Sequence, residues 1–239
     1  MKRTMVRWRE VFIGMILIFL SPLSIAASGD GDLRTAHAVM EETTSRVMEV
    51  LAEAETYHDE DPDRYYQQIH GVLDELVDFD FFARAVMGRY ASRQRYEAMN
   101  ADQKMKFKEQ VSRFSSVIRI GLVRTYGKGL LAFNGSEVKI MPPDADFDLN
   151  DSSITVVQHI YSEAKDPYII RYSMHKSRSE AWRMRNMIVE SINLGQIYRN
   201  QFEAAMRDHK GNIDRVIDSW AIDEGDSDAE AKLQAGASS

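Results

Sequence analysis

The chain has 239 residues, of which 37 are Asp or Glu and 30 are Lys or Arg, so its formal net charge is −7. This acidic balance argues against a protein whose surface as a whole attracts nucleic acid. The chain contains no cysteine, which excludes disulfides, thiol chemistry and a cysteine-linked lipid anchor. We therefore expect the fold to be held by its apolar core.

The first 26 residues have the composition of a secretory signal peptide. A basic start precedes an apolar run over 11–20, and the small-residue motif Ser24-Ile25-Ala26 follows it. The apolar run is only about half of the ~20 residues that a membrane-spanning helix needs. We therefore predict that 1–26 is cleaved on export and that the mature protein is soluble. An uncleaved anchor is the alternative.

Apolar residues then recur at steps of three and four, which predicts amphipathic helices over 33–54, 61–76, 78–90 and 100–126. Asp61-Pro62 is a cap followed by a proline suited to a first helical turn. The second half of the 100–126 helix is apolar nearly all round, which indicates burial on several sides or contact with a ligand. Gly127 and Gly129 are expected to end this helix.

From Ser136 onward the apolar period changes from 3.6 to 2. The new period predicts four strands, at 137–141, 152–162, 167–176 and 181–191, in an antiparallel meander with one packed face. Helices at 194–207 and 213–220 follow, and the acidic segment 223–239 is predicted to be disordered. Helices, strands and helices in this order predict an α+β fold with a single domain over 27–222.

Motifs for catalysis and metal binding are nearly absent. The aspartates Asp144, Asp146 and Asp148 resemble the start of a calcium loop. Leu149 and Thr155 stand, however, where that loop needs a glycine and a bidentate glutamate. The six histidines do not share zinc-ligand spacing on one helix. We expect no metal, no cofactor and no enzymatic activity.

Asp78 and Asp80 flank Phe79 and leave two interpretations open. Two carboxylates beside an apolar pocket can act as a general acid and base. Aspartates at the start of a helix also cap its backbone N–H groups and favour the helix dipole. Capping is the favoured interpretation.

Three apolar features together predict an interior between the sheet and a helical layer that accommodates a small apolar ligand. They are the aromatic segment 79–90, the apolar half of the 100–126 helix and the packed face of the sheet. The expected lining residues are Phe82, Val86, Phe114, Val117, Ile118, Leu122, Val123, Ile170 and Tyr172.

Basic residues are concentrated between Arg84 and Lys128. Eleven Lys or Arg face three Asp or Glu in this stretch, which gives a local charge of +8. A solvated helix face explains such a stretch, and a docking surface for lipid phosphates or an acidic partner is the alternative. The candidate docking residues are Arg84, Arg89, Arg93 and Arg124.

Several motifs resemble the MlaC family of periplasmic phospholipid-binding proteins, also called toluene-tolerance auxiliary proteins. They are Val77-Asp78-Phe79-Asp80-Phe81-Phe82-Ala83-Arg84, Gly88-Arg89-Tyr90, Leu122-Val123-Arg124-Thr125-Tyr126, Trp182 and Tyr198-Arg199-Asn200-Gln201-Phe202. The chain departs from the family pattern at Ala91, Asn186 and Ser191, where tryptophan, aspartate and glycine are typical.

The resemblance implies a curved, NTF2-like sheet with acyl chains held between sheet and helices. It also implies a carrier in the periplasm that moves glycerophospholipid between an outer-membrane lipoprotein–porin complex and an inner-membrane ABC transporter with its substrate-binding component. Such transport maintains outer-membrane lipid asymmetry. Two other functions stay open, namely a periplasmic enzyme that uses Asp78 or His159, and an adaptor with a filled core.

Overall fold

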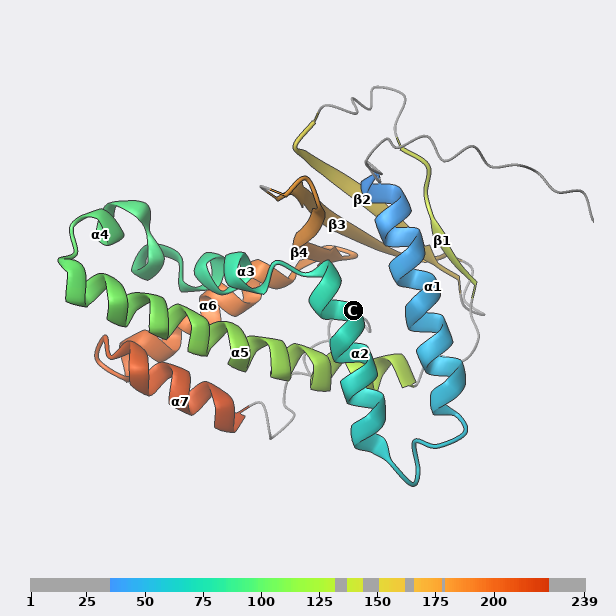
Figure 1. Ribbon diagram of the computed structural model, residues 1–239, viewed down its shortest axis with the longest axis horizontal. Helices are drawn as coiled ribbons and strands as arrows, with labels where there is room; N and C mark the ends of the chain where they lie inside the picture. Colours follow the sequence, from blue (N-terminus) through green and yellow to red (C-terminus); the bar gives the residue numbers. More distant parts are fainter. Residues whose placement is uncertain (1–34, 132–136, 144–150, 162–165, 178, 224–239) are drawn as a thin grey trace, which may run out of the picture. The chain divides into compact units, whose positions relative to one another are not determined.

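The computed structural model describes residues 35–131, 137–143, 151–161, 166–177 and 179–223 (Figure 1). The helices and strands of the described residues belong to one unit that begins at Leu33. The predicted signal peptide, the acidic segment after Asp223 and the calcium-loop-like aspartates 144–148 lie outside the described residues.

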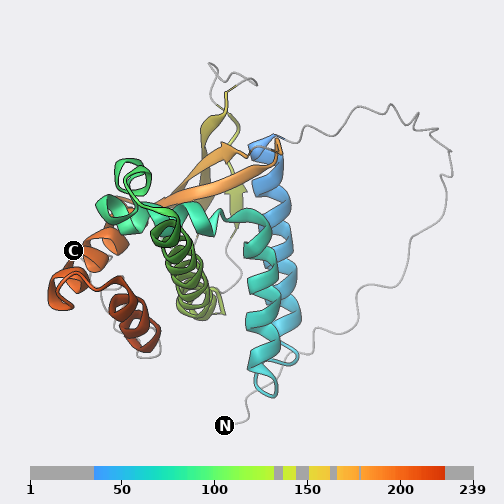
Figure 2. The same cartoon turned by 60° about the vertical axis from the view of Figure 1, so that its left-hand side comes forward.

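The described chain starts with two antiparallel helices, α1 (Ala36–Ala54) and α2 (Pro62–Leu76), which lie side by side (Figure 2). The Thr35 hydroxyl caps α1 by accepting from the N–H of Ala38 at 3.1 Å. Asp61 caps α2, and Pro62 occupies its first turn as predicted. An ion pair between Arg46 and Glu75 joins the two helices.

The predicted 78–90 helix is divided in two at a glycine. Helix α3 (Phe79–Met87) ends at Gly88, whose φ of +53° lies in the left-handed region. A 3₁₀ helix, η1 (Gly88–Ala91), and a short helix, α4 (Arg93–Glu97), follow. Helix α4 was not predicted, because five residues are too few to show an apolar period.

The long helix α5 (Ala101–Leu131) continues through both glycines that were expected to end it. Gly127 is instead required by packing, since an added Cβ would lie 3.1 Å from the Tyr66 ring. The hydroxyl of Tyr65 donates a 2.7 Å hydrogen bond to the Gly127 carbonyl. The prediction of the helix end was therefore wrong because the glycine serves a close helix–helix contact.

The strands form one antiparallel sheet in the order β1-β2-β3-β4-β5. They are β1 (Val138–Ile140), β2 (Ser153–Ile160), β3 (Tyr168–Lys176), β4 (Trp182–Val189) and β5 (Ile192–Asn193). The fifth strand was not predicted. It arises because the chain turns at Glu190, which has a φ of +55°, and pairs back on β4.

Two further helices, α6 (Leu194–Asp208) and α7 (Ile213–Asp223), complete the α+β architecture that the sequence predicted. Asn193 caps α6 by accepting from the N–H of Gln196 at 3.1 Å. Asn186 fixes the same turn, because its side-chain oxygen accepts from the N–H of Gly195 at 3.1 Å. One departure from the family pattern thus has a structural role here.

Alternate residues of the sheet face the helices, as the period of two predicted. On this inner face Val156, Tyr172 and Met174 are buried, whereas Thr155 and Arg171 on the outer face are exposed. The amide of Gln158 also lies on the inner face, where it donates to the hydroxyl of Thr44 on α1 at 3.0 Å. Helix α1 therefore packs on the inner face.

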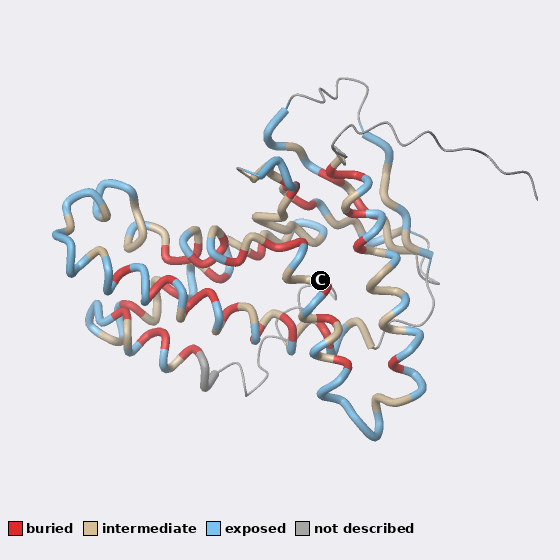
Figure 3. The backbone as a smooth tube through the Cα atoms, viewed as in Figure 1, coloured by how far each residue is buried: buried red, intermediate tan, exposed pale blue. Residues whose placement is uncertain are grey.

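Figure 3 marks the buried residues along the backbone. Their side chains form three clusters. The helical cluster joins α3, α5, α6 and α7 and contains Phe82, Ala83, Val86, Met87, Phe107, Val111, Phe114, Ile118, Tyr198, Phe202, Met206, Ile213, Val216, Ile217 and Trp220. The sheet cluster contains Ala36, Met40, Leu76, Val77, Phe79, Val156, Tyr172, Met174 and Trp182. The hairpin cluster contains Ala54, Tyr65, Ile69 and Val123.

Within the described residues, none of the helices combines the length and the apolar character that crossing a membrane requires.

Candidate functional site

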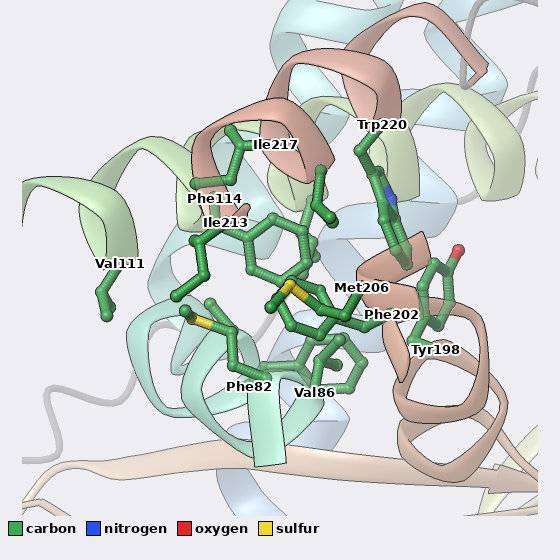
Figure 4. Close-up of a cluster of buried hydrophobic side chains, with 14 of the residues drawn as sticks. Phe82, Val86, Val111, Phe114, Tyr198, Phe202, Met206, Ile213, Ile217 and Trp220 are labelled. Carbon is green, nitrogen blue, oxygen red and sulfur yellow. The ribbon is translucent and has the colours of Figure 1, made fainter. Parts of the chain in front are cut away.

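Four of the predicted lining residues, Phe82, Val86, Phe114 and Ile118, lie in the helical cluster. Side chains from α3, α5, α6 and α7 meet there (Figure 4). The Phe114 ring lies 5.0 Å from the Phe202 ring and 5.3 Å from the Trp220 ring, centroid to centroid. Aromatic side chains thus surround these residues, and Val86, Phe114 and Ile118 have no exposed surface.

Val117 is partly buried at the edge of the helical cluster. It lines a shallow groove of about 290 Å³ between α5 and α7, together with Ser112, Arg113, Ser116, Ile217 and Asp218. Arg113 and Asp218 form an ion pair at 2.7 Å beside this groove. The groove has charged edges and is therefore a poor site for hydrocarbon.

Val123 lies on a different side of α5, in the hairpin cluster with Tyr65 and Ile69. It therefore faces away from Phe114 and Ile118, which lie on the same helix but belong to the helical cluster. Burial raises the pKa of Tyr65 above its ordinary value, which keeps its hydroxyl protonated as a hydrogen-bond donor.

The remaining three predicted residues belong to the sheet cluster or pack against it, namely Tyr172 as a member and Leu122 and Ile170 at its edge. Leu122 is partly buried and packs against both the helical cluster and the sheet cluster. Ile170 and Tyr172 lie two positions apart on the inner face of β3. The structure thus brings these three together and distributes the other six over the helical and hairpin clusters.

An apolar strip continues along the inner face beyond Tyr172 and is only half covered. We define the inner-face strip as Ile160, Tyr168, Ile170, Met187 and Val189. The register places Ile160 opposite Tyr168, and Ile170 opposite Val189. Tyr168 is 47% exposed. The strip is thus an apolar surface next to Leu122 and the sheet cluster, suited to an apolar ligand.

Four residues of the strip, Ile160, Tyr168, Met187 and Val189, were not among the predicted lining residues. Ile160 could have been identified from the period of two. Tyr168 lies two positions before Ile170 and so shares its face, and Ile160 is the residue opposite Tyr168 on β2. The residues of β4 are harder to find, since the pairing shifts between Ser173 and Met174. This bulge puts Met184 and Met187, three positions apart, on the same face.

Asp78 caps a helix, as favoured above. Its carboxylate accepts a 3.0 Å hydrogen bond from the N–H of Phe81 and pairs with Arg185 at 3.0 Å. The Arg185 guanidinium lies 4.2 Å from the centroid of the Phe81 ring, which stacks on His175. Burial, and then the charge of Arg185, lower the pKa of His175. This arrangement holds the start of α3 on the sheet.

The second candidate for acid–base chemistry, His159, is on the outer face opposite Ile169. Its ring lies 6.2 Å from the Tyr161 ring, centroid to centroid. Asp78 and His159 therefore belong to separate environments. The described part of the chain holds no group of three side chains that could bind a metal ion.

The candidate docking arginines lie on four different elements. Arg84, Arg89 and Arg93 are exposed on α3, η1 and α4, whereas Arg124 is exposed on the C-terminal half of α5. Arg93 is paired with Glu97 at 2.6 Å. Arg89 donates to the hydroxyl of Tyr90 at 3.0 Å.

Comparison with known proteins identifies the family. The sequence profile described as MlaC protein matches residues 41–221, which is most of the chain. The chain belongs to the MlaC family. This family consists of non-enzymatic lipid-binding carriers, which agrees with the absence of a catalytic motif in the sequence.

Two known proteins illustrate how far the similarity extends. The toluene tolerance protein ttg2D of Pseudomonas putida is 26% identical over 207 residues, which cover 87% of either chain. The solved structure of a phospholipid-binding protein from Ralstonia solanacearum, in complex with a phospholipid, matches with a TM-score of 0.60. That match has 18% identity and covers 80% of this chain and 99% of the other, so the MlaC fold is shared.

Proposed function

We propose that this protein carries a glycerophospholipid through the periplasm. The acyl chains would lie on the inner-face strip and against Leu122 and Tyr172. The carrier would exchange lipid with an outer-membrane lipoprotein–porin complex and with the substrate-binding component of an inner-membrane ABC transporter. In this role it would help to maintain the lipid asymmetry of the outer membrane.

The observation that carries the proposal is the half-covered strip itself. Ile170, Met187 and Leu122 pack against the sheet cluster yet stay partly exposed. Leaving apolar surface in water costs about 25 cal/mol per Å². A hydrocarbon chain laid on the strip would remove that cost without any change in the helical cluster. The phospholipid complex of the structural relative and the family membership support the same cargo.

The energetics of lipid transfer explain why a carrier needs such a surface. Each acyl CH₂ removed from water contributes about 0.8 kcal/mol, so two chains of ~16 carbons represent roughly 25 kcal/mol. A lipid therefore leaves a membrane readily only when a comparable apolar environment receives it. Its phosphate would stay at the edge of the site, since burying an unpaired charge is costly.

The proposal is tested by native mass spectrometry of the protein after periplasmic expression. We expect a bound mass that corresponds to a glycerophospholipid and that is recovered by solvent extraction. Protein without such a mass, and without uptake of lipid from vesicles, would support the adaptor and contradict the carrier.

Neighbouring isoleucines of β3 provide a matched pair of variants for the site. Ile170 lies on the inner face and Ile169 on the outer face, and both are half-buried. We expect Ile170→Glu to lose most of the bound lipid, because its carboxylate would face the acyl chains. Ile169→Glu should keep it. Equal lipid content in the two folded variants would remove the strip from the site.

A further inference from the structure

Positive charge is concentrated at the end of the unit formed by η1, α4 and the first turns of α5. We call residues 88–108 the basic end. They contain six Lys or Arg and two Asp or Glu, which gives +4 within a chain of net charge −7. In Figure 1, α4 lies beside the start of α5.

Aromatic rings join these short elements and carry their cations. The guanidinium groups of Arg89 and Arg95 lie 5.0 and 6.0 Å from the centroid of the Tyr90 ring. The Lys104 ammonium lies 5.4 Å from the Tyr96 ring, which contacts the Phe107 ring at 5.7 Å. Because Tyr90 and Tyr96 pack against the helical cluster, the positions of these cations are defined by the core.

Most of this charge is uncompensated. Arg93 pairs with Glu97 at 2.6 Å, and Lys106 pairs with Asp214 at 3.2 Å. Across the residues that the structure describes, no carboxylate lies within 4 Å of the cationic groups of Arg89, Arg95, Lys104 and Lys108. These four side chains are therefore available to an anionic partner.

An exposed apolar side chain lies in the first turns of α5, next to Lys108. Met105 is 68% exposed, more than any other large apolar side chain of the described residues. Lys108 follows Met105 by three positions, so these two side chains are neighbours on the helix surface. An apolar side chain beside a lysine is suited to a membrane interface, where the ammonium group stays at the phosphates.

We propose that the basic end docks on the surface of an anionic phospholipid membrane, with Met105 inserted between the head groups. Lysine and arginine near such a surface are attracted by its negative potential, and a flexible thioether enters irregular apolar gaps easily. An acidic protein partner would use the charges but leave Met105 without a role. Docking concerns the outside of the protein and does not depend on which cargo the interior holds.

The absence of native cysteine permits a direct test. The full chain with Met105→Cys is labelled with an environment-sensitive fluorophore and mixed with phosphatidylcholine vesicles that contain about 30% phosphatidylglycerol. We expect a blue shift with these vesicles, none with pure phosphatidylcholine, and weaker binding as salt rises. An unshifted probe, or equal binding to both vesicles, would overturn the proposal.

Charge reversal locates the surface. Lys104→Glu with Lys108→Glu should weaken vesicle binding about tenfold in cosedimentation, and helix α5 tolerates acidic residues in its first turns. The control is the double variant Arg64→Glu with Arg171→Glu, which changes the net charge by the same amount. Its two sites are exposed on α2 and on the outer face of β3, so vesicle binding should change less than about twofold. Equal losses in the two double variants would mean that only net charge matters. Native mass spectrometry reports the cargo separately, so docking and lipid carriage can fail independently.

Discussion

The hydroxyl of Tyr172 donates a 2.7 Å hydrogen bond to the side-chain oxygen of Gln158 across strands β2 and β3. Both side chains are buried on the inner face. The amide nitrogen of Gln158 donates in turn to Thr44 on α1. This chain of hydrogen bonds links a helix to the sheet through an otherwise apolar interior. Burial raises the pKa of Tyr172 above its ordinary value, so the donor stays protonated at neutral pH.

We expect Tyr172→Phe to lower the free energy of unfolding by about 1–2 kcal/mol, because Gln158 would keep a buried acceptor without its partner. Urea unfolding followed by circular dichroism measures this difference. Tyr168→Phe is the control, since Tyr168 is 47% exposed on the same strand, and it should change stability by less than about 0.5 kcal/mol. A neutral Tyr172→Phe would show that the hydrogen bond contributes little.

The two contacts of Asp78 can be separated by two substitutions. Asp78→Asn keeps an oxygen for the N–H of Phe81 but loses the charge that pairs with Arg185, and we expect a cost of about 0.5–1 kcal/mol. Asp78→Ala loses both contacts and should cost about 2 kcal/mol in total. Chemical denaturation of both variants measures the difference. If they were equally stable, the capping hydrogen bond would not matter.

Asp214 should contribute to stability only above acidic pH. Burial opposes its ionisation, but hydrogen bonds from Gln110 and Lys106 and the nearby charge of Arg113 lower its pKa below the ordinary value. The ionised form is thus favoured in the folded state. Its contribution is present above the ordinary pKa of about 3.9 and is lost as the pH falls below it.

We therefore expect Asp214→Asn to cost about 1 kcal/mol at pH 7, with variant and wild type converging below about pH 4. Urea unfolding at several pH values gives both quantities. Asp59→Asn, at a fully exposed side chain, should match the wild type throughout. A difference that persisted undiminished at low pH would contradict an electrostatic origin.

The helical cluster and the inner-face strip should respond differently to truncation. Phe202 has no exposed surface and contacts the rings of Phe114 and Trp220. We expect Phe202→Ala to cost about 3–5 kcal/mol through the cavity it leaves. Met187 is partly exposed, so Met187→Ala should lower the free energy of unfolding by less than about 2 kcal/mol. The same substitution should nevertheless reduce the amount of bound lipid. Thermal unfolding and lipid extraction on the same samples compare the two.

Much of this architecture could be predicted from local sequence. The periods of 3.6 and 2 located α1, α2, α6 and three longer strands to within a few residues, and they located the start of α5 but not its end. The caps at Asp61 and Asp78 were also correct, because they depend on residues close in the chain. The role of Gly127 was misjudged, because its contact with Tyr66 is tertiary and leaves no signal in the local sequence. Helix α4 was missed because five residues are too few to show a period.

The candidate site shows the same division. The sequence by itself determined which residues are apolar, which alternate on β3, and that α5 is apolar on several sides. It could not determine which side of α5 each residue faces, so Ile118, Leu122 and Val123 were assigned to one lining, although they lie in different environments. Only the tertiary structure decided this, because burial of a helix surface depends on the partners that pack on it. The bulge opposite Ser173 likewise set which residues of β4 join the inner face, because a pairing shift depends on contacts with the neighbouring strand.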